Sequence, residues 1–174
     1  MTRKIQWDRI AALAESMRER AYAPYSNYRV GAVLLARKNA KSQVEVFVGA
    51  NVENASYPVC ACAERTAVNS AVIAGVREFV ALTVATAGPR PAAPCGMCRQ
   101  ILAEFARDLP IGLVVAGKVV EFTSLAVLLP KMFGGADLAE AAMKTKPKAK
   151  VTQRAKAKPT VTKTTKSRRP SVGK

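Results

Sequence analysis

The chain has 174 residues, 49% of them hydrophobic, which is long enough for one well-packed domain and too short for two ordinary ones. It contains no histidine, so histidine-ligated zinc sites and every hydrolytic mechanism built on a Ser-His or Cys-His pair are excluded. The net charge of +16 is concentrated at one end, because residues 1–142 hold 16 basic and 12 acidic residues whereas residues 143–174 hold 12 basic residues and no acidic ones.

The sequence predicts neither a membrane span nor a secretory signal. No run of eighteen apolar residues occurs, and the first eight residues, Met-Thr-Arg-Lys-Ile-Gln-Trp-Asp, lack the apolar core of a signal peptide. We therefore expect a cytoplasmic protein without membrane association. In that reducing compartment the four cysteines are expected to be metal ligands or buried thiols rather than disulfides.

The N-terminal part of the chain predicts a helix followed by a hairpin. Residues 8–22 carry apolar side chains at three- and four-residue spacing, the pattern of an amphipathic helix that covers a sheet. Pro24 ends this helix, and the Val- and Leu-rich residues 28–36 predict a strand that turns into a second strand at residues 44–49. The polar loop that follows, residues 51–56, is of the kind that often binds ligands.

The remaining chain alternates between helices and strands. The predicted helices span residues 62–74, 95–107 and 125–129, and the predicted strands span residues 80–86, 111–115 and 118–122. Gly75 stops the first of these helices, and Gly117 turns the last two strands into a hairpin. This order predicts one α/β domain, a three-layer α/β/α sandwich with a mixed five-stranded sheet whose later strands are joined by helical crossovers.

Three cysteines and a glutamate have the spacing of a catalytic zinc site. Cys62, Cys95 and Cys98 supply three ligands, and a catalytic zinc ion usually takes three protein ligands and keeps its fourth position for water or substrate. Glu64 follows the first ligand by two residues, which places a carboxylate beside the open position, as a general acid and base requires. The sequence therefore predicts one Zn²⁺ per subunit, with Glu64 as the catalytic residue.

The pair formed by Cys95 and Cys98 also has an interpretation as a Cys-x-x-Cys redox motif. That interpretation leaves Cys62 and Glu64 without a role, so zinc binding is favoured. Cys60 is expected to be a small buried thiol beside the site, because a fourth thiolate ligand would close the coordination shell and remove the catalytic water.

Three thiolates around Zn²⁺ give a site with a net charge of −1, and such electron-rich ligands weaken the metal as a Lewis acid. The N-termini of the helices that start at Cys62 and Cys95 can offset this charge, since each is equivalent to about half a positive charge. The guanidinium of Arg65 can do the same by hydrogen-bonding the ligand sulfur atoms, and Arg99 is a second candidate for that task. For both arginines the alternative is a solvated helix face or a surface ion pair.

The two ligand motifs resemble those of a known enzyme superfamily. Cys62-Ala63-Glu64 matches the ligand-x-Glu step, and Pro94-Cys95-Gly96-Met97-Cys98 matches the Pro-Cys-x-x-Cys step, of zinc-dependent nucleoside and nucleobase deaminases. The first ligand in this chain is a cysteine, so the resemblance is to the members with three cysteine ligands rather than to the histidine-ligated ones.

Three further segments resemble the small cytidine deaminases of the homotetrameric type: residues 21–32 (AYAPYSNYRVGA), residues 51–55 (NVENA) and residues 128–133 (LLPKMF). The resemblance covers about residues 8–138. It implies zinc-dependent hydrolytic deamination of cytidine and deoxycytidine to uridine and deoxyuridine, in pyrimidine salvage, by a homotetramer with the cytidine deaminase-like fold. Residues 1–142 would form the catalytic domain.

Residue by residue, the resemblance implies that Asn51 and Glu53 bind the ribose hydroxyls and that Glu64 contacts N3 and the 4-amino group of the pyrimidine. It also implies that Phe133 packs on a nucleoside bound in a neighbouring subunit. Tyr28 stands where many members have phenylalanine, and it keeps an aromatic surface for stacking. From the residues alone, Asn51 and Glu53 could equally be turn residues, and Phe133 could be a core aromatic.

Three other functions remain open. A deaminase of modified cytosine nucleosides would share the zinc motif but lack the Asn-x-Glu loop, which is present at residues 51–53. A structural zinc protein or nucleic-acid binder would not need Glu64 beside an open coordination position. Editing of cytosine in polynucleotides would need an open groove where the tetrameric family has a closed pocket.

The segment 143–174 is rich in Lys, Ala, Thr, Pro and Ser and contains no aromatic residue, which predicts a disordered tail without a counterpart in the family's catalytic unit. Its 12 basic residues predict weak, salt-sensitive and sequence-independent binding to nucleic acid. A solvated extension without a partner is the alternative.

Overall fold

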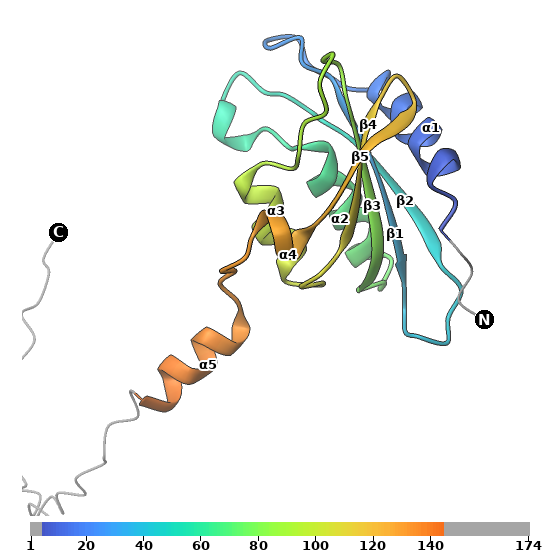
Figure 1. Cartoon of the computed structure of the whole chain (residues 1–174). Coiled ribbons are helices and arrows are strands. Elements are labelled where there is room, and N and C mark those ends of the chain that lie inside the picture. Colours follow the sequence, from blue (N-terminus) through green and yellow to red (C-terminus); the bar gives the residue numbers. More distant parts are fainter. Residues whose placement is uncertain (1–4, 145–174) are drawn as a thin grey trace, which may run out of the picture.

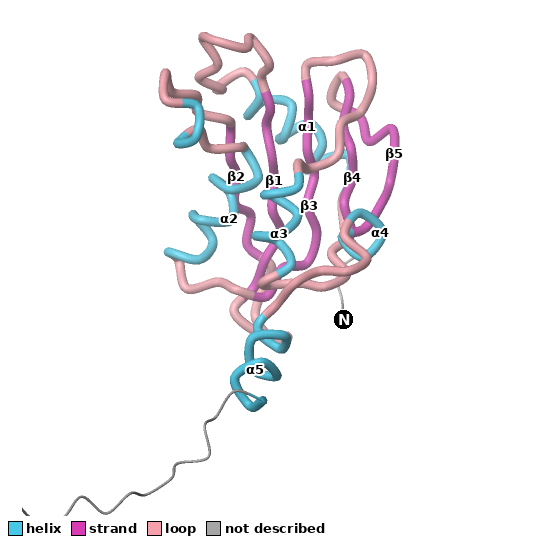
Figure 2. The backbone as a smooth tube through the Cα atoms, turned by 90° about the vertical axis from the view of Figure 1, so that its left-hand side faces the viewer, coloured by secondary structure: helices cyan, strands magenta, loops and turns pink. Residues whose placement is uncertain are grey.

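A single mixed sheet forms the middle of the molecule in the computed structural model, which describes residues 5–144. The strands are β1 (Val30–Arg37), β2 (Glu45–Ala50), β3 (Glu78–Thr86), β4 (Pro110–Val115) and β5 (Lys118–Ser124). They lie in the order β2-β1-β3-β4-β5, as Figure 2 shows. β1 pairs antiparallel with both β2 and β3, β3 and β4 run parallel, and β4 and β5 form an antiparallel hairpin.

Helices cover both faces of this sheet. α1 (Trp7–Arg18) lies on one face, and α2 (Ala63–Ile73) and α3 (Gly96–Ala103) lie on the other (Figure 1). α2 connects β2 to β3, and α3 connects β3 to its parallel neighbour β4, so both are crossover connections. The predicted three-layer α/β/α sandwich with a mixed five-stranded sheet is therefore confirmed.

Strand β1 contributes side chains to two hydrophobic cores, one on each face of the sheet, because its side chains alternate between the faces. Ala32, Leu34 and Ala36 belong to the larger core beneath α2 and α3, whereas Val33 and Leu35 belong to the smaller core beneath α1. All five are 8% exposed or less. The unbroken apolar run that predicted this strand is the result of burial on both faces.

Two glycines allow the helices to approach the sheet closely. A Cβ atom on Gly31 in β1 would lie 2.1 Å from the Ala14 carbonyl oxygen of α1, and one on Gly49 in β2 would lie 2.1 Å from the Ala63 carbonyl oxygen of α2. No side chain fits at such a distance, so both positions require glycine for reasons of space. Gly49 thereby determines how closely the first turn of α2 lies on the sheet.

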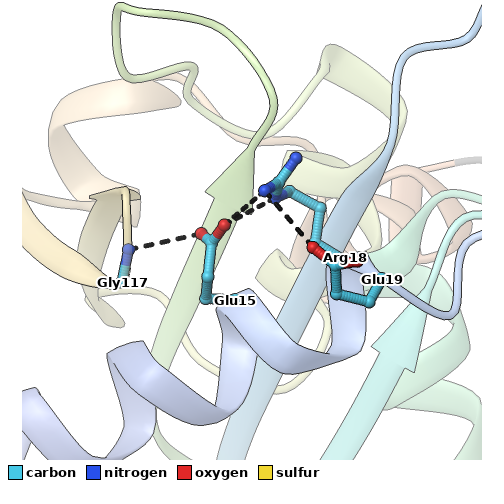
Figure 3. Close-up of polar contacts among 4 residues, drawn as sticks. All are labelled: Glu15, Arg18, Glu19 and Gly117. Carbon is cyan, nitrogen blue, oxygen red and sulfur yellow. Dashed lines mark hydrogen bonds and ion pairs between the residues drawn. The ribbon is translucent and has the colours of Figure 1, made fainter.

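On the α1 face, a carboxylate joins the helix to the β4–β5 turn (Figure 3). Glu15 Oε1 accepts a 2.8 Å hydrogen bond from Nε of Arg18, and Oε2 accepts a 3.3 Å bond from the backbone N–H of Gly117. Glu19 lies 3.7 Å from the same guanidinium. The turn has positive φ angles at Ala116 (49°) and Gly117 (74°), as tight hairpin turns that follow the strand twist require.

The ends of two helices differ from the sequence prediction. α1 ends at Arg18, because Tyr22 leaves the helix and donates its backbone N–H to the Asn51 carbonyl at 3.0 Å. α3 ends at Ala103, four residues before its predicted end, because the chain turns there and buries Leu109 completely. Both differences arise from tertiary contacts that override the local helical pattern. Two short helices, the 3₁₀ helix η1 and the α-helix α4, complete the domain: Tyr57–Val59 and Leu125–Leu128.

The sequence pattern does not predict the last helix, α5 (Gly135–Lys144), although Ala, Leu and Glu favour helices. Asp137 accepts the backbone N–H of Gly134 at 2.8 Å near its start. The helix points away from the sandwich (Figure 1), and its side chains are exposed as far as Met143. The sequence predicts disorder for residues 143–174, but Met143 and Lys144 belong to α5; residues 145–174 lie outside the described residues. Between residues 5 and 144, every helix is too short or too polar to span a membrane.

Candidate metal centre and substrate cavity

Cys62 and Cys95 occupy equivalent places in the two crossover helices. Each is the N-cap residue of its helix, α2 and α3 respectively, with an extended backbone conformation, and Cys98 follows in the first turn of α3. The three Sγ atoms lie within 4.8 Å of one another. The fold thus brings together the thiols that the sequence predicts as zinc ligands.

This thiol cluster has the dimensions of a zinc site. The Sγ atoms of Cys62 and Cys95 are 3.9 Å apart, and a tetrahedral site with Zn–S bonds of about 2.3 Å needs sulfur atoms about 3.8 Å apart. Cys98 is buried and Cys95 is exposed, so the cluster lies at the boundary between core and solvent. Within residues 5–144, these cysteines form the only group of three or more Cys, Asp or Glu side chains with such a geometry.

The surroundings favour ionisation of one thiol. The pKa of Cys62 is lowered to about 5, chiefly because the Cys98 thiol donates a hydrogen bond to its thiolate and further because the Arg65 guanidinium is close. The same hydrogen bond, together with burial, raises the pKa of Cys98. Because zinc binds the thiolate form, the lowered pKa of Cys62 favours metal binding by this thiol.

Arg65 lies beside the cluster. Its guanidinium donates a hydrogen bond to the Cys60 carbonyl, and its Nη2 atom is 3.9 Å from Sγ of Cys62. Its positive charge is therefore next to the sulfur of a predicted zinc ligand. Cys60 itself is half-buried, and its Sγ accepts a hydrogen bond from the Asn54 backbone N–H at 3.2 Å instead of joining the three-thiol cluster.

Arg99 has a different role from the one that the sequence suggested for it. Its guanidinium donates hydrogen bonds to the carbonyl oxygens of Pro94 at 2.7 Å and of Leu128 at 3.0 Å. These bonds tie the segment before α3 to the end of α4. Its polar atoms are thus directed to the backbone, and none of the roles considered for it, a sulfur contact, a solvated helix face or a surface ion pair, describes these contacts.

Glu64 is the second residue of α2 and is 5% exposed. Burial raises the pKa of its carboxyl group, and the nearby Cys62 thiolate contributes to the rise. A carboxyl group whose pKa is moved toward neutrality can accept a proton and return it at neutral pH, which is what a general acid and base must do.

A cavity of about 420 Å³ opens beside the cluster. It is lined by the turn at residues 25–26, by Asn51 and Glu53, and by the segment 57–62, with Arg65 and Met97 from the first turns of α2 and α3. Its volume is in the range of small-molecule sites. A second cavity, of about 470 Å³, lies on the α1 face with a mostly apolar lining and contains none of the predicted site residues.

The side chains of Asn51 and Glu53 face the cavity and also hold the preceding segment in place. Asn51 Oδ1 accepts the backbone N–H of Val30 at 2.8 Å, and Nδ2 donates to the Tyr28 carbonyl at 2.9 Å. The carboxylate of Glu53 accepts hydrogen bonds from the turn at residues 25–26. Both the turn-residue alternative and the ligand-binding prediction are therefore compatible with the geometry.

Tyr28 and Phe133 lie apart from this cavity. The Tyr28 side chain is 44% exposed and that of Phe133 is 56% exposed. Phe133 lines a separate depression with Arg107 beyond the end of α3, and Gln100 donates a 2.8 Å hydrogen bond to its carbonyl. The structure thus brings the other predicted site residues together and leaves these two aromatic side chains accessible to a second chain.

Sequence reasoning missed six residues that line the cavity: Tyr25, Ser26, Tyr57, Pro58, Ala61 and Met97. Tyr25 and Tyr57 form an edge-to-face aromatic pair with ring centroids 5.9 Å apart. Met97 stands between two predicted zinc ligands, and that position was a usable signal. Tyr25 and Ser26 are in a turn and Tyr57 begins η1, and each meets partners that are far away in sequence, so spacing alone gives no indication of them.

Comparisons with known proteins agree with this geometry. Residues 5–113 match the family model of the cytidine and deoxycytidylate deaminase zinc-binding region. The chain is 42% identical over 136 residues to a cytidine deaminase of Sporosarcina psychrophila, which covers 78% of this chain and 96% of the relative. It is 43% identical over 123 residues to a cytidine deaminase of Halalkalibacterium halodurans, which covers 70% of this chain and 89% of the relative.

Solved structures show the same likeness. A cytidine deaminase from Burkholderia pseudomallei has a TM-score of 0.67 and 43% identity, with 74% of this chain and 100% of that chain covered. A cytidine deaminase from Mycobacterium tuberculosis has a TM-score of 0.64 and 32% identity, with 75% of this chain and 99% of that chain covered. The similarity therefore extends over fold as well as sequence.

Proposed function

The chain belongs to the family of cytidine and deoxycytidylate deaminases, which are zinc-dependent hydrolases, and on that premise we propose that it converts free cytidine and deoxycytidine to uridine and deoxyuridine. The strongest support is that Cys62, a member of the three-thiol cluster, lines a cavity large enough for a nucleoside and is followed two residues later by the buried carboxyl group of Glu64. We also propose a role in pyrimidine salvage and a cytoplasmic location.

In this proposal Cys62, Cys95 and Cys98 hold the zinc ion, because their spacing suits tetrahedral coordination with one position left open. When bound there, zinc supplies a Lewis acid that lowers the pKa of the attacking water. Arg65 and the N-termini of α2 and α3 offset the excess negative charge of three thiolates.

Glu64 moves protons between water and the pyrimidine. Its carboxylate takes a proton from the attacking water and gives it to N3 of the base as the hydroxide adds to C4. It then takes the proton of the new hydroxyl on C4 and transfers it to the 4-amino group, which leaves as ammonia. One water molecule is consumed, the C4–N bond breaks and a C4 carbonyl forms. The raised pKa of Glu64 suits this task, since the group must be a base in one step and an acid in the next.

Asn51 and Glu53 bind the sugar in this proposal. After the contacts within the chain, the Asn51 amide retains one N–H and one lone pair, and the Glu53 carboxylate retains about one of its roughly four acceptor sites. That capacity matches a single hydroxyl that accepts from the amide and donates to the carboxylate. The ring hydroxyl that cytidine and deoxycytidine share is the 3′-hydroxyl, so we assign it to this position.

The test is to incubate the zinc-loaded protein with cytidine, deoxycytidine and a cytosine-containing oligonucleotide, and to separate the products by chromatography. We expect uridine and deoxyuridine, each with an equal amount of ammonia, and an unchanged oligonucleotide. Deamination of the oligonucleotide alone would favour polynucleotide editing. Turnover of modified cytosine nucleosides alone would favour a detoxifying deaminase, and absence of any product would overturn the proposal.

The active form that we propose is a homotetramer in which Phe133 of one subunit contacts the nucleoside bound by another. The exposure of Phe133 and its separation from the cavity of its own chain support this assignment. An isolated subunit would then have an incomplete site, so activity should fall when the oligomer dissociates. Light scattering combined with activity measurements on diluted protein tests the proposal, and a fully active monomer would rule it out.

For the basic segment 143–174, most of which lies outside the described residues, we propose weak binding to nucleic acid that localises the enzyme without taking part in catalysis. The support is the sequence alone, with 12 basic residues and no acidic ones. The logarithm of the affinity should fall with the logarithm of salt concentration by roughly 0.7 to 0.9 per phosphate neutralised. Truncation after Met143 should remove oligonucleotide binding at low salt, and equal binding by both proteins would exclude it.

A further inference from the structure

The turn at residues 25–28 is fastened to the cavity wall by an acidic side chain. Two backbone N–H groups, those of Tyr25 and Ser26, donate to Oε2 of Glu53 at 3.0 and 3.1 Å. The Ser26 hydroxyl donates to the other carboxylate oxygen, Oε1. Both oxygens of Glu53 are therefore held from one side, so the turn determines how the carboxylate is oriented in the cavity.

The Ser26 hydroxyl has a defined direction because it makes a second hydrogen bond. Its Oγ atom accepts the backbone N–H of Tyr28 at 2.9 Å. That bond occupies a lone pair of the oxygen on the side of Tyr28, and the single hydroxyl proton is directed to Glu53. Ser26 therefore links the carboxylate to the backbone two residues further along the chain.

The link continues to the other side chain that is proposed to bind the sugar. The Tyr28 carbonyl accepts the 2.9 Å hydrogen bond from Nδ2 of Asn51, so Glu53 and Asn51 are connected through Ser26 and one backbone residue. Ser26 also lines the same cavity as both. Its hydroxyl is the largest cause of the lowered pKa of Glu53, and it thereby helps to keep this carboxylate an ionised acceptor.

We propose that Ser26 is a positioning residue for sugar recognition, whose hydroxyl directs the remaining acceptor site of Glu53 at the 3′-hydroxyl of the nucleoside. The inference rests on the proposed function and adds to it a residue that acts on the substrate through another side chain. Ser26 affects the binding of the sugar and leaves the chemistry at C4 to other residues. Its influence is therefore restricted to substrates that carry the 3′-hydroxyl.

The experiment compares Ser26→Ala with the unaltered enzyme on cytidine, deoxycytidine and 2′,3′-dideoxycytidine. For the first two substrates KM should rise about three- to tenfold, the net effect of one hydrogen bond, while kcat stays within about twofold, because binding and not the transition state is affected. For 2′,3′-dideoxycytidine, which lacks the hydroxyl, KM should be unchanged. Ser26→Thr keeps a hydroxyl and should restore a KM near that of the unaltered enzyme.

Two controls separate positioning from a general effect on the fold. In a Glu53→Ala background, Ser26→Ala should raise KM no further, since the side chain that it orients is already absent. Ser42→Ala removes a hydroxyl in the β1–β2 turn, away from the residues that line the cavity, and should leave all three KM values unchanged. If Ser26→Ala folds poorly, Ser26→Cys provides a weaker donor of similar size and should give a smaller rise in KM with the same substrate dependence.

Each remaining outcome has a definite meaning. A normal KM for cytidine in both Ser26→Ala and Ser26→Cys would overturn the role of Ser26 and leave the proposed function intact. Equal rises in KM for cytidine and 2′,3′-dideoxycytidine, or a loss of kcat that Ser26→Thr does not restore, would likewise overturn it, because these results indicate a structural role alone. Failure of the unaltered enzyme to deaminate cytidine would overturn the proposed function, and this inference with it.

Discussion

Helices α1 and α2 pack on opposite faces of the same sheet, and each depends on a glycine: Gly31 beneath α1 and Gly49 beneath α2. The consequences differ between the two faces. On the α1 face lie a small apolar core and the Glu15 contact to the β4–β5 turn, and the residues that line the candidate cavity come from other parts of the chain. On the α2 face, the turn above Gly49 begins at Cys62 and contains Glu64.

The comparison shows that close packing of a helix against a glycine in the sheet has different consequences on the two faces. On the α1 face, close approach of helix and sheet contributes to stability. On the α2 face it also sets the position of a proposed metal ligand, Cys62, and of the proposed proton-transfer group, Glu64, because both belong to the turn that touches the glycine. A small displacement of α2 moves both groups relative to α3, whereas an equal displacement of α1 moves neither.

The largest effect is expected where the α2 face contributes ligands. Cys98→Ala removes a buried thiol and should abolish turnover, because the two remaining thiolates are too few to hold the zinc ion. Bound zinc, measured by elemental analysis, should fall from one ion per chain to nearly none. Cys60→Ala is the matched control and should retain the metal, since Cys60 is outside the cluster. Loss of zinc from the control would show that a fourth thiol takes part.

Next in size is the loss of proton transfer without loss of metal. Glu64→Gln should lower kcat by about 10²- to 10⁴-fold, the usual contribution of a positioned acid and base, and should leave zinc content unchanged. Steady-state kinetics and elemental analysis of the same preparation give both numbers. A variant without zinc would mean that Glu64 is a ligand, and a variant with normal kcat would remove it from the chemistry.

The two glycines give the direct test of the contrast. Gly31→Ala and Gly49→Ala should each destabilise the fold by about 1–3 kcal/mol, because an added methyl group must displace helix backbone. Gly49→Ala should in addition lower kcat of the folded enzyme by about 10- to 100-fold, as misplacement of reacting groups does. Urea unfolding and kinetics measure the two effects, and equal kcat values for both variants would remove the distinction between the faces.

The smallest effect concerns the contact drawn in Figure 3. Glu15→Gln should lower the free energy of unfolding by about 0.5–1.5 kcal/mol, because it weakens the bonds to Arg18 and to the Gly117 N–H, and should leave turnover unchanged. Glu19→Gln is its control, because the carboxylate of Glu19 is exposed and lies 3.7 Å from the Arg18 guanidinium, so this pair contributes little. A loss of activity in Glu15→Gln would mean that the α1 face is coupled to the site.

The sequence by itself determined the layered fold and identified the three cysteines of the cluster, since the order of the elements and the spacings within each cysteine motif are short-range patterns. That Cys62 meets Cys95, 33 positions further along the chain, is a tertiary contact. The apolar run of β1 indicated burial on both faces, the glycine at position 117 indicated the last hairpin, and the spacing of Cys95 and Cys98 placed two thiols in the first turn of one helix. Glu64 two residues after Cys62 likewise placed a carboxylate beside a ligand within a single turn. Such patterns need no knowledge of distant parts of the chain.

Only the tertiary structure decided which residues meet across long stretches of sequence. Ser26 and Glu53 are 27 positions apart and become neighbours because the segment before β1 lies against the loop after β2. The Arg99 guanidinium donates a hydrogen bond to the Leu128 carbonyl because the tertiary fold places α4 beside α3. Helix α3 likewise ends at Ala103, before its predicted end, because of tertiary packing. The spacing of residues along the chain does not predict such contacts. The free energy that favours them comes from burial and from hydrogen bonds that form only when the helices and strands pack together.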